Sequence, residues 1–344
     1  MRGRQNRDDL AVSEVIGVVM LLAMIVSVMA GVWIFLQPYV KEFQDNTNWA
    51  SANGIADRLE DRFAVVGVAP EGVGIRQTLS VVSTQVIPII NSESWIISAD
   101  LVGYEETQIE EVNGSAFTLK TINGSASTVE IVCSDGTENY TVNDLGETIT
   151  INHNLSIYTF VMITVYDDSG VAIHRHVGIS ISGVKVVTVM QNGHHEIALI
   201  NDARIEKFPQ ESWVISQGPD LELDELYDGR MRGSLRLVDV NVNGSLSNGN
   251  KIAFDLISQG PLELFSGSVH NVRFSYLSSI DSIITPQIQE GWLTDYTLHR
   301  ASGTLDQHRG ISPWQRASGS DGFTIDSGGL IDLEIDLHRI EVRT

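Results

Sequence analysis

Cysteine is almost absent from this chain of 344 residues, which contains only Cys133. A single cysteine cannot form an intramolecular disulfide, and it cannot supply the several thiolates of a Cys-based zinc site. A chain of this length can bury most of its apolar surface without such covalent or metal staples. We therefore expect packing alone to stabilise the fold.

Lysine is also scarce, with five residues against 17 arginines, while Asp and Glu together number 44 and the formal net charge is −22. A surface of this sign repels phosphate backbones, so we expect no nucleic-acid partner. An acidic, lysine-poor surface suits a protein bathed in salt, where counter-ions screen its self-repulsion. The same composition is compatible with an ordinary acidic cell-surface protein.

Sequence motifs of catalysis are missing as well. The chain has no nucleophile elbow, phosphate-binding glycine loop or dinucleotide fingerprint. Its many adjacent carboxylates are typical of solvated acidic faces, although a glycosidase pair distant in sequence stays an alternative. We expect the protein not to be an enzyme and to hold no cofactor.

The histidines provide at most half of a metal site. His174 and His176 lie two apart in an expected strand and share one face, and His194-His195 falls in an expected turn. A zinc site needs three or four converging ligands, so we expect none here. Residues 224–235 resemble a calcium loop only superficially, because leucines occupy two ligand positions. Calcium bound between β-loops stays an open alternative.

One long apolar run stands out from this polar background. Val15 to Leu36 are 22 consecutive residues without a charge, which as a helix would span about 33 Å, enough for the hydrocarbon core of a membrane. Arg2, Arg4 and Arg7 precede the run, whereas only Lys41 follows it closely. The positive-inside rule then predicts a single-pass protein of the cell membrane with a cytoplasmic N-terminus and an extracellular C-terminal domain.

The stretch RQNRDDLAVSEVIGVVMLLAMIVSVMAGVWIF resembles the N-terminus of archaeal type IV pilin-like and archaellin-like proteins. The resemblance implies a charged leader at 1–11, removed by a prepilin peptidase between Ala11 and Val12, and a retained helix at 12–40. It also implies that Glu14 pairs with the N-terminal amine of a neighbouring subunit in a homo- or hetero-oligomer. A position of Glu14 among lipid headgroups, and ordinary signal cleavage after Ala30, are the alternatives.

Gly17 belongs to the same assembly hypothesis. A glycine in a membrane helix lets a second helix approach closely, and Gly31 is a second such position. The two glycines are not at GxxxG spacing, so they do not define a dimer motif.

Beyond the membrane run we expect a stem helix at 41–66, because Ile55, Leu59 and Phe63 recur at helical spacing. From Gly67 onward short Val/Ile/Thr-rich runs alternate with Gly, Asn, Asp and Ser, which is typical of strands and turns. The expected fold is mainly β: a transmembrane helix and a stem helix followed by one or two antiparallel β-sandwich units. A repeat of ESWIIS as ESWVIS favours two β-units, at 67–182 and 183–344.

Two local patterns within this part are specific. Ile331, Leu333, Ile335 and Leu337 alternate strictly with polar residues, which predicts a strand with one face in contact with water. Asp168-Ser169-Gly170 separates two strand-like runs, which predicts a hairpin turn.

Five Asn-x-Ser/Thr sequons are glycosylation candidates if the domain lies outside the cell. Three of them read Asn-Gly-Ser, which is equally typical of β-turns. The asparagines are Asn113, Asn123, Asn139, Asn154 and Asn243.

Two functions follow from this organisation. The first is a membrane-anchored extracellular structural protein resembling an archaeal type IV pilin-like subunit, whose apolar helix anchors the chain or assembles a filament. The second is a permanently anchored surface binding or adhesion module for glycan, calcium or protein partners. Removal of residues 1–11 would distinguish them, because a permanent anchor does not need to lose its leader.

Overall fold

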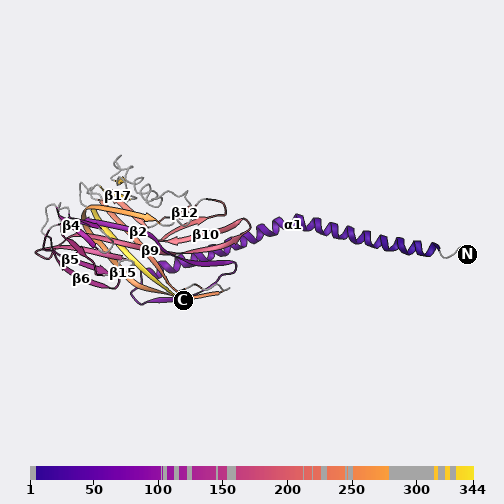
Figure 1. Cartoon of the computed structure of the whole chain (residues 1–344), viewed down its shortest axis with the longest axis horizontal. Coiled ribbons are helices and arrows are strands. Elements are labelled where there is room, and N and C mark those ends of the chain that lie inside the picture. Colours follow the sequence, from indigo (N-terminus) through magenta and orange to yellow (C-terminus); the bar gives the residue numbers. More distant parts are fainter. Residues whose placement is uncertain are drawn as a thin grey trace.

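A computed structural model describes most of the chain, and all structural statements below concern its described residues. These residues are 5–101, 103, 107–111, 116–121, 126–144, 146–152, 160–211, 213–218, 220–225, 231–244, 246, 251–278, 314–316, 322–325 and 331–344. They form one long helix and 18 strands (Figure 1).

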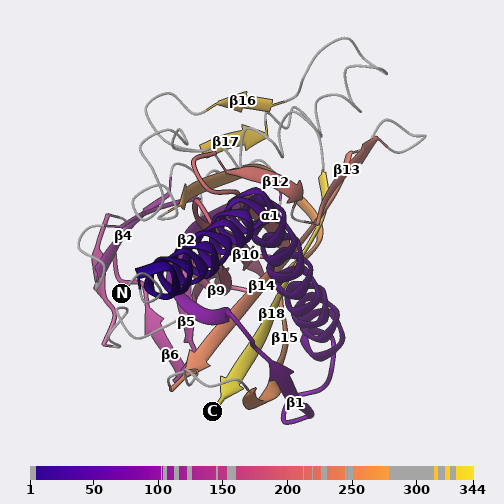
Figure 2. The ribbon, with the colours of Figure 1, turned by 90° about the vertical axis from the view of Figure 1, so that its right-hand side faces the viewer.

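Helix α1 (Gln5–Gly67) is continuous over 63 residues, about 95 Å at the usual rise. The expected transmembrane and stem helices are therefore parts of one element. Pro38 lies inside it and removes one backbone hydrogen bond, and the helix changes direction between its protruding and docked parts (Figure 2). After Gly67 the chain turns, with Ala69 N–H donating to the Val66 carbonyl at 3.1 Å.

The C-terminal part of α1 docks on the β-rich part of the chain through one apolar stripe. Its buried members recur every three or four residues, which is the spacing of one helix face. They are Ala52, Ile55, Ala56, Leu59, Phe63 and Val66. They share a hydrophobic cluster with side chains of seven strands, among them Val238 and Val240. Burying a side chain such as Leu59 or Phe63 contributes about 1.5–3 kcal/mol, so this stripe fixes the stem firmly.

Fifteen strands form one connected, unclosed sheet with the central order β12-β11-β10-β9-β2-β15-β18-β14-β13. The strands on this path are β12 (Val214–Gln217), β11 (Ala203–Lys207), β10 (Gly193–Ile200), β9 (Ala172–Met190), β2 (Thr84–Asp100), β15 (Lys251–Ser278), β18 (Ile331–Arg343), β14 (Met231–Asn243) and β13 (Leu221–Glu225). The strands that branch from it are β1 (Gly74–Ser80), β5 (Ala126–Cys133), β6 (Gly136–Thr141), β8 (Phe160–Asp167), β16 (Trp314–Arg316) and β17 (Gly322–Ile325).

Almost all neighbouring strands are antiparallel, as expected. The exception among the described pairs is β14 with β18, which run parallel over thirteen residue pairs from Met231–Ile331 to Asn243–Arg343. The long strand β15 links two parts of the sheet, because its first part pairs with β1 and β18 and its last part pairs with β2. The residue at the expected boundary, Gly183, lies inside β9, so the division into two units stays a prediction.

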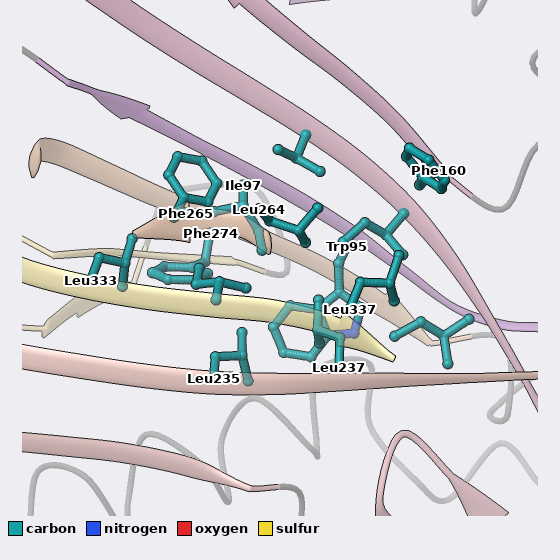
Figure 3. Close-up of a cluster of buried hydrophobic side chains, with 14 of the residues drawn as sticks. Trp95, Ile97, Phe160, Leu235, Leu237, Leu264, Phe265, Phe274, Leu333 and Leu337 are labelled. Atoms are coloured by element: carbon teal, nitrogen blue, oxygen red, sulfur yellow. The ribbon is translucent and has the colours of Figure 1, made fainter. Parts of the chain in front are cut away.

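The main core lies where β2 and β9 face β14 and β18. Trp95, Leu237, Phe265 and Leu337 are each at most 2 % exposed and belong to one cluster (Figure 3). Inward residues follow strand alternation, as predicted for the run from Ile331 to Leu337. Packing between side chains of distant segments therefore replaces the missing disulfides.

A smaller sheet covers a second core. It consists of β3 (Thr107–Glu111), β4 (Ala116–Thr121) and β7 (Thr148–Thr150). Phe117 and Leu119 of β4 are buried with Val129 and Ile131 of β5. Cys133 is buried in the same cluster, where burial raises the pKa of its thiol to about 11. The only cysteine therefore behaves as a small apolar residue.

The predicted hairpin at Asp168-Ser169-Gly170 is confirmed. It joins antiparallel β8 and β9, and Gly170 has a positive φ of 76°. The carboxylate of Asp167 accepts hydrogen bonds from the backbone N–H groups of Ser169 and Val171, both at 2.8 Å. This is the Asx-type turn chemistry that the Asp and Gly residues indicated.

Candidate functional site: the two halves of helix α1

The N-terminal half of α1 protrudes from the β-rich part without touching it (Figure 1). Every side chain from Val15 to Val40 is exposed, including Trp33, Ile34 and Phe35 at 66–69 %. Monomeric proteins in water rarely expose an apolar surface of this extent. Helix α1 is the one helix within the described chain that is long and apolar enough to cross a membrane.

The length of the protruding half fits a bilayer. Its 26 exposed residues extend about 39 Å, against a hydrocarbon core of about 30 Å. The first charged residue after it is Lys41. The apolar segment can thus cover the hydrocarbon core with room for tilt.

The C-terminal half of α1 is held by charge as well as by its apolar stripe. Arg204 of β11 reaches back to the helix, with Nη1 at 2.5 Å from Asp57 Oδ1 and 3.7 Å from Glu60 Oε2. Its Nη2 also donates to the Asn53 side chain. Burial raises the pKa of Glu60, and the positive Arg204 opposes that rise. One guanidinium therefore joins three helix positions to the sheet.

Next to its protruding half, α1 forms two hydrogen bonds with the β-rich part. Gln191 N–H donates to Asp45 Oδ1 at 2.9 Å, and Asn48 Nδ2 donates to the Val189 carbonyl at 3.0 Å. These bonds place the turn between β9 and β10 beside the helix. They define the end of the β-rich part that faces the apolar half.

The residues predicted for processing and assembly lie on α1. Ala11, Val12 and Glu14 fall within its backbone span, and their side chains are outside the described part. Gly17 is exposed, and a Cβ added there would meet no atom within 4 Å. The surface at Gly17 is therefore open to a second helix or to lipid.

Two of the five sequons lie in the described part. Asn139 is exposed on β6, and Asn243 is exposed at the end of β14 with its Nδ2 3.4 Å from Glu341 Oε1. Both side chains are reachable from solvent. Asn113, Asn123 and Asn154 lie outside the described residues.

His174 and His176 lie on β9, where His174 is buried and His176 is partly buried. His174 Nδ1 lies 2.7 Å from Asp100 Oδ1, and Asn271 Nδ2 donates to Asp100 Oδ2 at 2.8 Å. Burial and the neighbouring His174 lower the pKa of His176 to about 4, so that ring is neutral at pH 7. Within the described chain no hydroxyl or thiol hydrogen-bonds to His174 Nε2, so the pair lacks the nucleophile of a catalytic triad.

The expectation for His194-His195 is wrong in its position. Both residues lie at the start of strand β10, and the turn precedes them at residues 191–192. His195 is fully buried, stacks on Phe208 at 4.5 Å and lies 3.4 Å from Glu206 Oε2. Burial lowers its pKa, which favours the neutral ring in the core. The turn thus lies three residues earlier in the chain than predicted.

Buried carboxylates form two further polar contacts that the sequence did not reveal. Glu93 Oε2 accepts from Trp95 Nε1 at 2.9 Å and from Asn201 Nδ2 at 3.0 Å. Asp239 accepts the Ser182 N–H at 2.8 Å, and burial raises its pKa to about 7. These bonds satisfy the buried carboxylates, and they join β2 to the turn between β10 and β11 and join β14 to β9, so the contacts are structural.

No group of three or more His, Cys, Asp or Glu side chains in the described residues could hold a metal ion. Of the superficial calcium loop, Asp224 and Glu225 belong to strand β13, and residues 226–230 lie outside the described part.

Comparisons with protein-family models, with curated proteins and with solved structures found no match for this chain.

Proposed function

We propose that this protein is a membrane-anchored extracellular structural protein of the archaeal type IV pilin-like kind. The observation that carries the proposal is the division of one continuous helix into an exposed apolar half and a docked half. The exposed half suits insertion into a membrane or packing against other apolar helices. The docked half holds the acidic β-rich part at a fixed place next to that anchor.

In this proposal residues 1–11 are a leader that a prepilin peptidase removes between Ala11 and Val12. The new N-terminal amine of one subunit then pairs with Glu14 of a neighbour, which neutralises two charges that are costly in an apolar environment. Open space around Gly17 supports close approach of a second helix. We also propose that the β-rich part consists of sandwich units facing the outside of the cell.

The test is the intact mass, with N-terminal peptide mapping, of the full-length protein isolated from membranes of cells that contain a prepilin peptidase. We expect a mature chain that begins at Val12. Cells that lack the peptidase provide the matched control, and there we expect the unprocessed chain.

Each of two other N-termini would support a different function for this chain. A chain that begins at Met1 in both preparations would indicate a permanent anchor and would favour a surface binding or adhesion module. A chain that begins at Gly31 would show ordinary signal cleavage and would contradict the membrane anchor itself.

A further inference from the structure

Two turns of the β-rich part lie beside the helix at the point where its protruding half ends. Val189 and Gln191 contact Asn48 and Asp45 through hydrogen bonds. The turn between β1 and β2 is adjacent, because Thr188 Oγ1 donates to the Ser83 carbonyl at 2.9 Å. Both turns therefore belong to the end of the molecule that faces the anchor.

These turns carry exposed apolar side chains. Val82, in the turn between β1 and β2, is 58 % exposed, and Val189, near the end of β9, is 57 % exposed, although polar residues are usual at turns. Trp49 of α1 follows Asn48, whose side chain donates to the Val189 carbonyl, and it is 39 % exposed. Tryptophan is enriched at membrane–water interfaces, where its ring contacts apolar groups and its N–H stays hydrated.

The same turns are free of charge in a strongly acidic protein. Residues 78–86 and 186–195 contain no Asp, Glu, Lys or Arg, although the chain has 44 acidic residues. At the opposite end of β9, the turn that joins β8 to β9 carries Asp167 and Asp168. These two turns lack acidic side chains, and the nearby carboxylates Glu42 and Asp45 belong to α1, so the turns themselves meet less repulsion from an anionic lipid surface than the opposite end would.

The distance along α1 from its apolar half to the two turns is similar to the thickness of the lipid headgroup layer. Asp45 and Asn48 follow Val40, the last residue of the protruding half, by five and eight positions. This is about 8–12 Å along the axis, and the headgroup layer on each side of the hydrocarbon core is about 5–8 Å thick. The helix tilt that is usual in bilayers reduces the remaining gap.

We propose that the turns at residues 81–83 and 189–192, together with Trp49, form a second membrane contact that rests on the outer lipid headgroups. This contact depends on the proposed membrane anchor. It would fix the orientation of the acidic β-rich part, which a single helix alone leaves free to rotate and tilt. The occupant of the exposed valines is lipid, not a second copy of the chain.

The test places spin labels on single cysteines in full-length protein, after Cys133→Ala, reconstituted into vesicles of phosphatidylglycerol and phosphatidylcholine. Labels at Val82→Cys and Val189→Cys report on the turns. Ser169→Cys in the far hairpin is the aqueous control, and Ile25→Cys in the protruding helix is the lipid control. Accessibility to molecular oxygen and to a water-soluble nickel chelate gives the depth of each label.

We expect nickel accessibility at Val82 and Val189 to be at least threefold lower than at Ser169, and the Ile25 label to lie deep in lipid. Turn labels that match Ser169 while Ile25 is in lipid would overturn the second contact and leave the anchor intact. An Ile25 label in water would overturn both proposals. Protection of the turns only at high protein-to-lipid ratios would assign them to a neighbouring subunit and overturn the lipid contact.

Discussion

The two halves of helix α1 have similar helical backbones and opposite surroundings. From Val15 to Leu36 apolar side chains cover all sides of the helix, and every one of them is exposed. From Ala52 to Val66 they form one stripe, and charged residues such as Arg58 and Arg62 cover the solvent face. The comparison shows that the distribution of apolar residues around a helix decides whether it docks on a protein or needs an apolar environment.

Truncation of one leucine in each half gives the largest expected difference. Leu59→Ala removes a side chain that is 1 % exposed and leaves a cavity against the sheet, so it should lower the free energy of unfolding by about 2–5 kcal/mol. Leu22→Ala, at a position 61 % exposed, should leave that free energy within about 0.5 kcal/mol. Urea unfolding of the full-length protein in detergent, followed by near-ultraviolet circular dichroism, measures both. Equal effects would contradict the division of the helix.

The pH dependence of folding stability should come from buried groups in the β-rich part, on which the stem docks. Asp239 lies between Val238 and Val240, which pack on the stem, and its pKa is raised to about 7. The folded state therefore keeps a proton that the unfolded state releases above about pH 4, so Asp239 lowers stability as pH rises from about 4 to about 7. His176 acts in the opposite sense between its lowered pKa of about 4 and the ordinary histidine value of about 6.5.

Asp239→Asn should remove the first of these effects. Relative to the unmodified protein, the variant should gain stability on the order of 4 kcal/mol as the pH rises from 4 to 7, because it lacks the carboxyl whose pKa is raised from about 4 to about 7. Melting temperatures across this pH range measure the change. Asp168→Asn, in the exposed hairpin, is the control and should leave the profile unchanged. An identical profile for Asp239→Asn would show that its burial does not affect folding.

The smallest effect concerns the charged contact of the stem. Arg204→Ala removes the cation between Asp57, Glu60 and Glu206 and leaves these carboxylates close together. Because Asp57 is 62 % exposed, solvent screens part of the interaction, and we expect a loss of about 1 kcal/mol. Arg76→Ala, whose partner Asp255 is 3.9 Å away across an exposed pair, should cost less than about 0.5 kcal/mol. High salt should reduce the difference between the two variants.

Much of this architecture follows from local sequence patterns. The spacing of Ile55, Leu59 and Phe63 predicted the docked face of the stem, and alternation from Ile331 to Leu337 predicted a strand with its inward face. Both patterns depend only on the period of the backbone. The mainly β fold and one long apolar helix are accordingly seen in the structure.

Long-range contacts could not be predicted in the same way. Arg204 is far from Asp57 in sequence, and nothing local to either residue marks the pair. The parallel pairing of β14 with β18 depends on the path of the intervening chain. Asp239 did carry a signal, because it shares a strand face with Leu235 and Leu237. In a chain with 44 acidic residues, this position in the strand does not by itself distinguish a buried carboxylate from a solvated one.

The single uninterrupted helix also has a mechanical consequence. A pull directed along its axis loads the buried residues from Ala52 to Val66 together in shear, because they are spread over about 21 Å of the same rod. A sideways pull loads Ala52 first and peels the stem away one turn at a time. The joint between α1 and the β-rich part should therefore resist tension along the rod far better than bending across it.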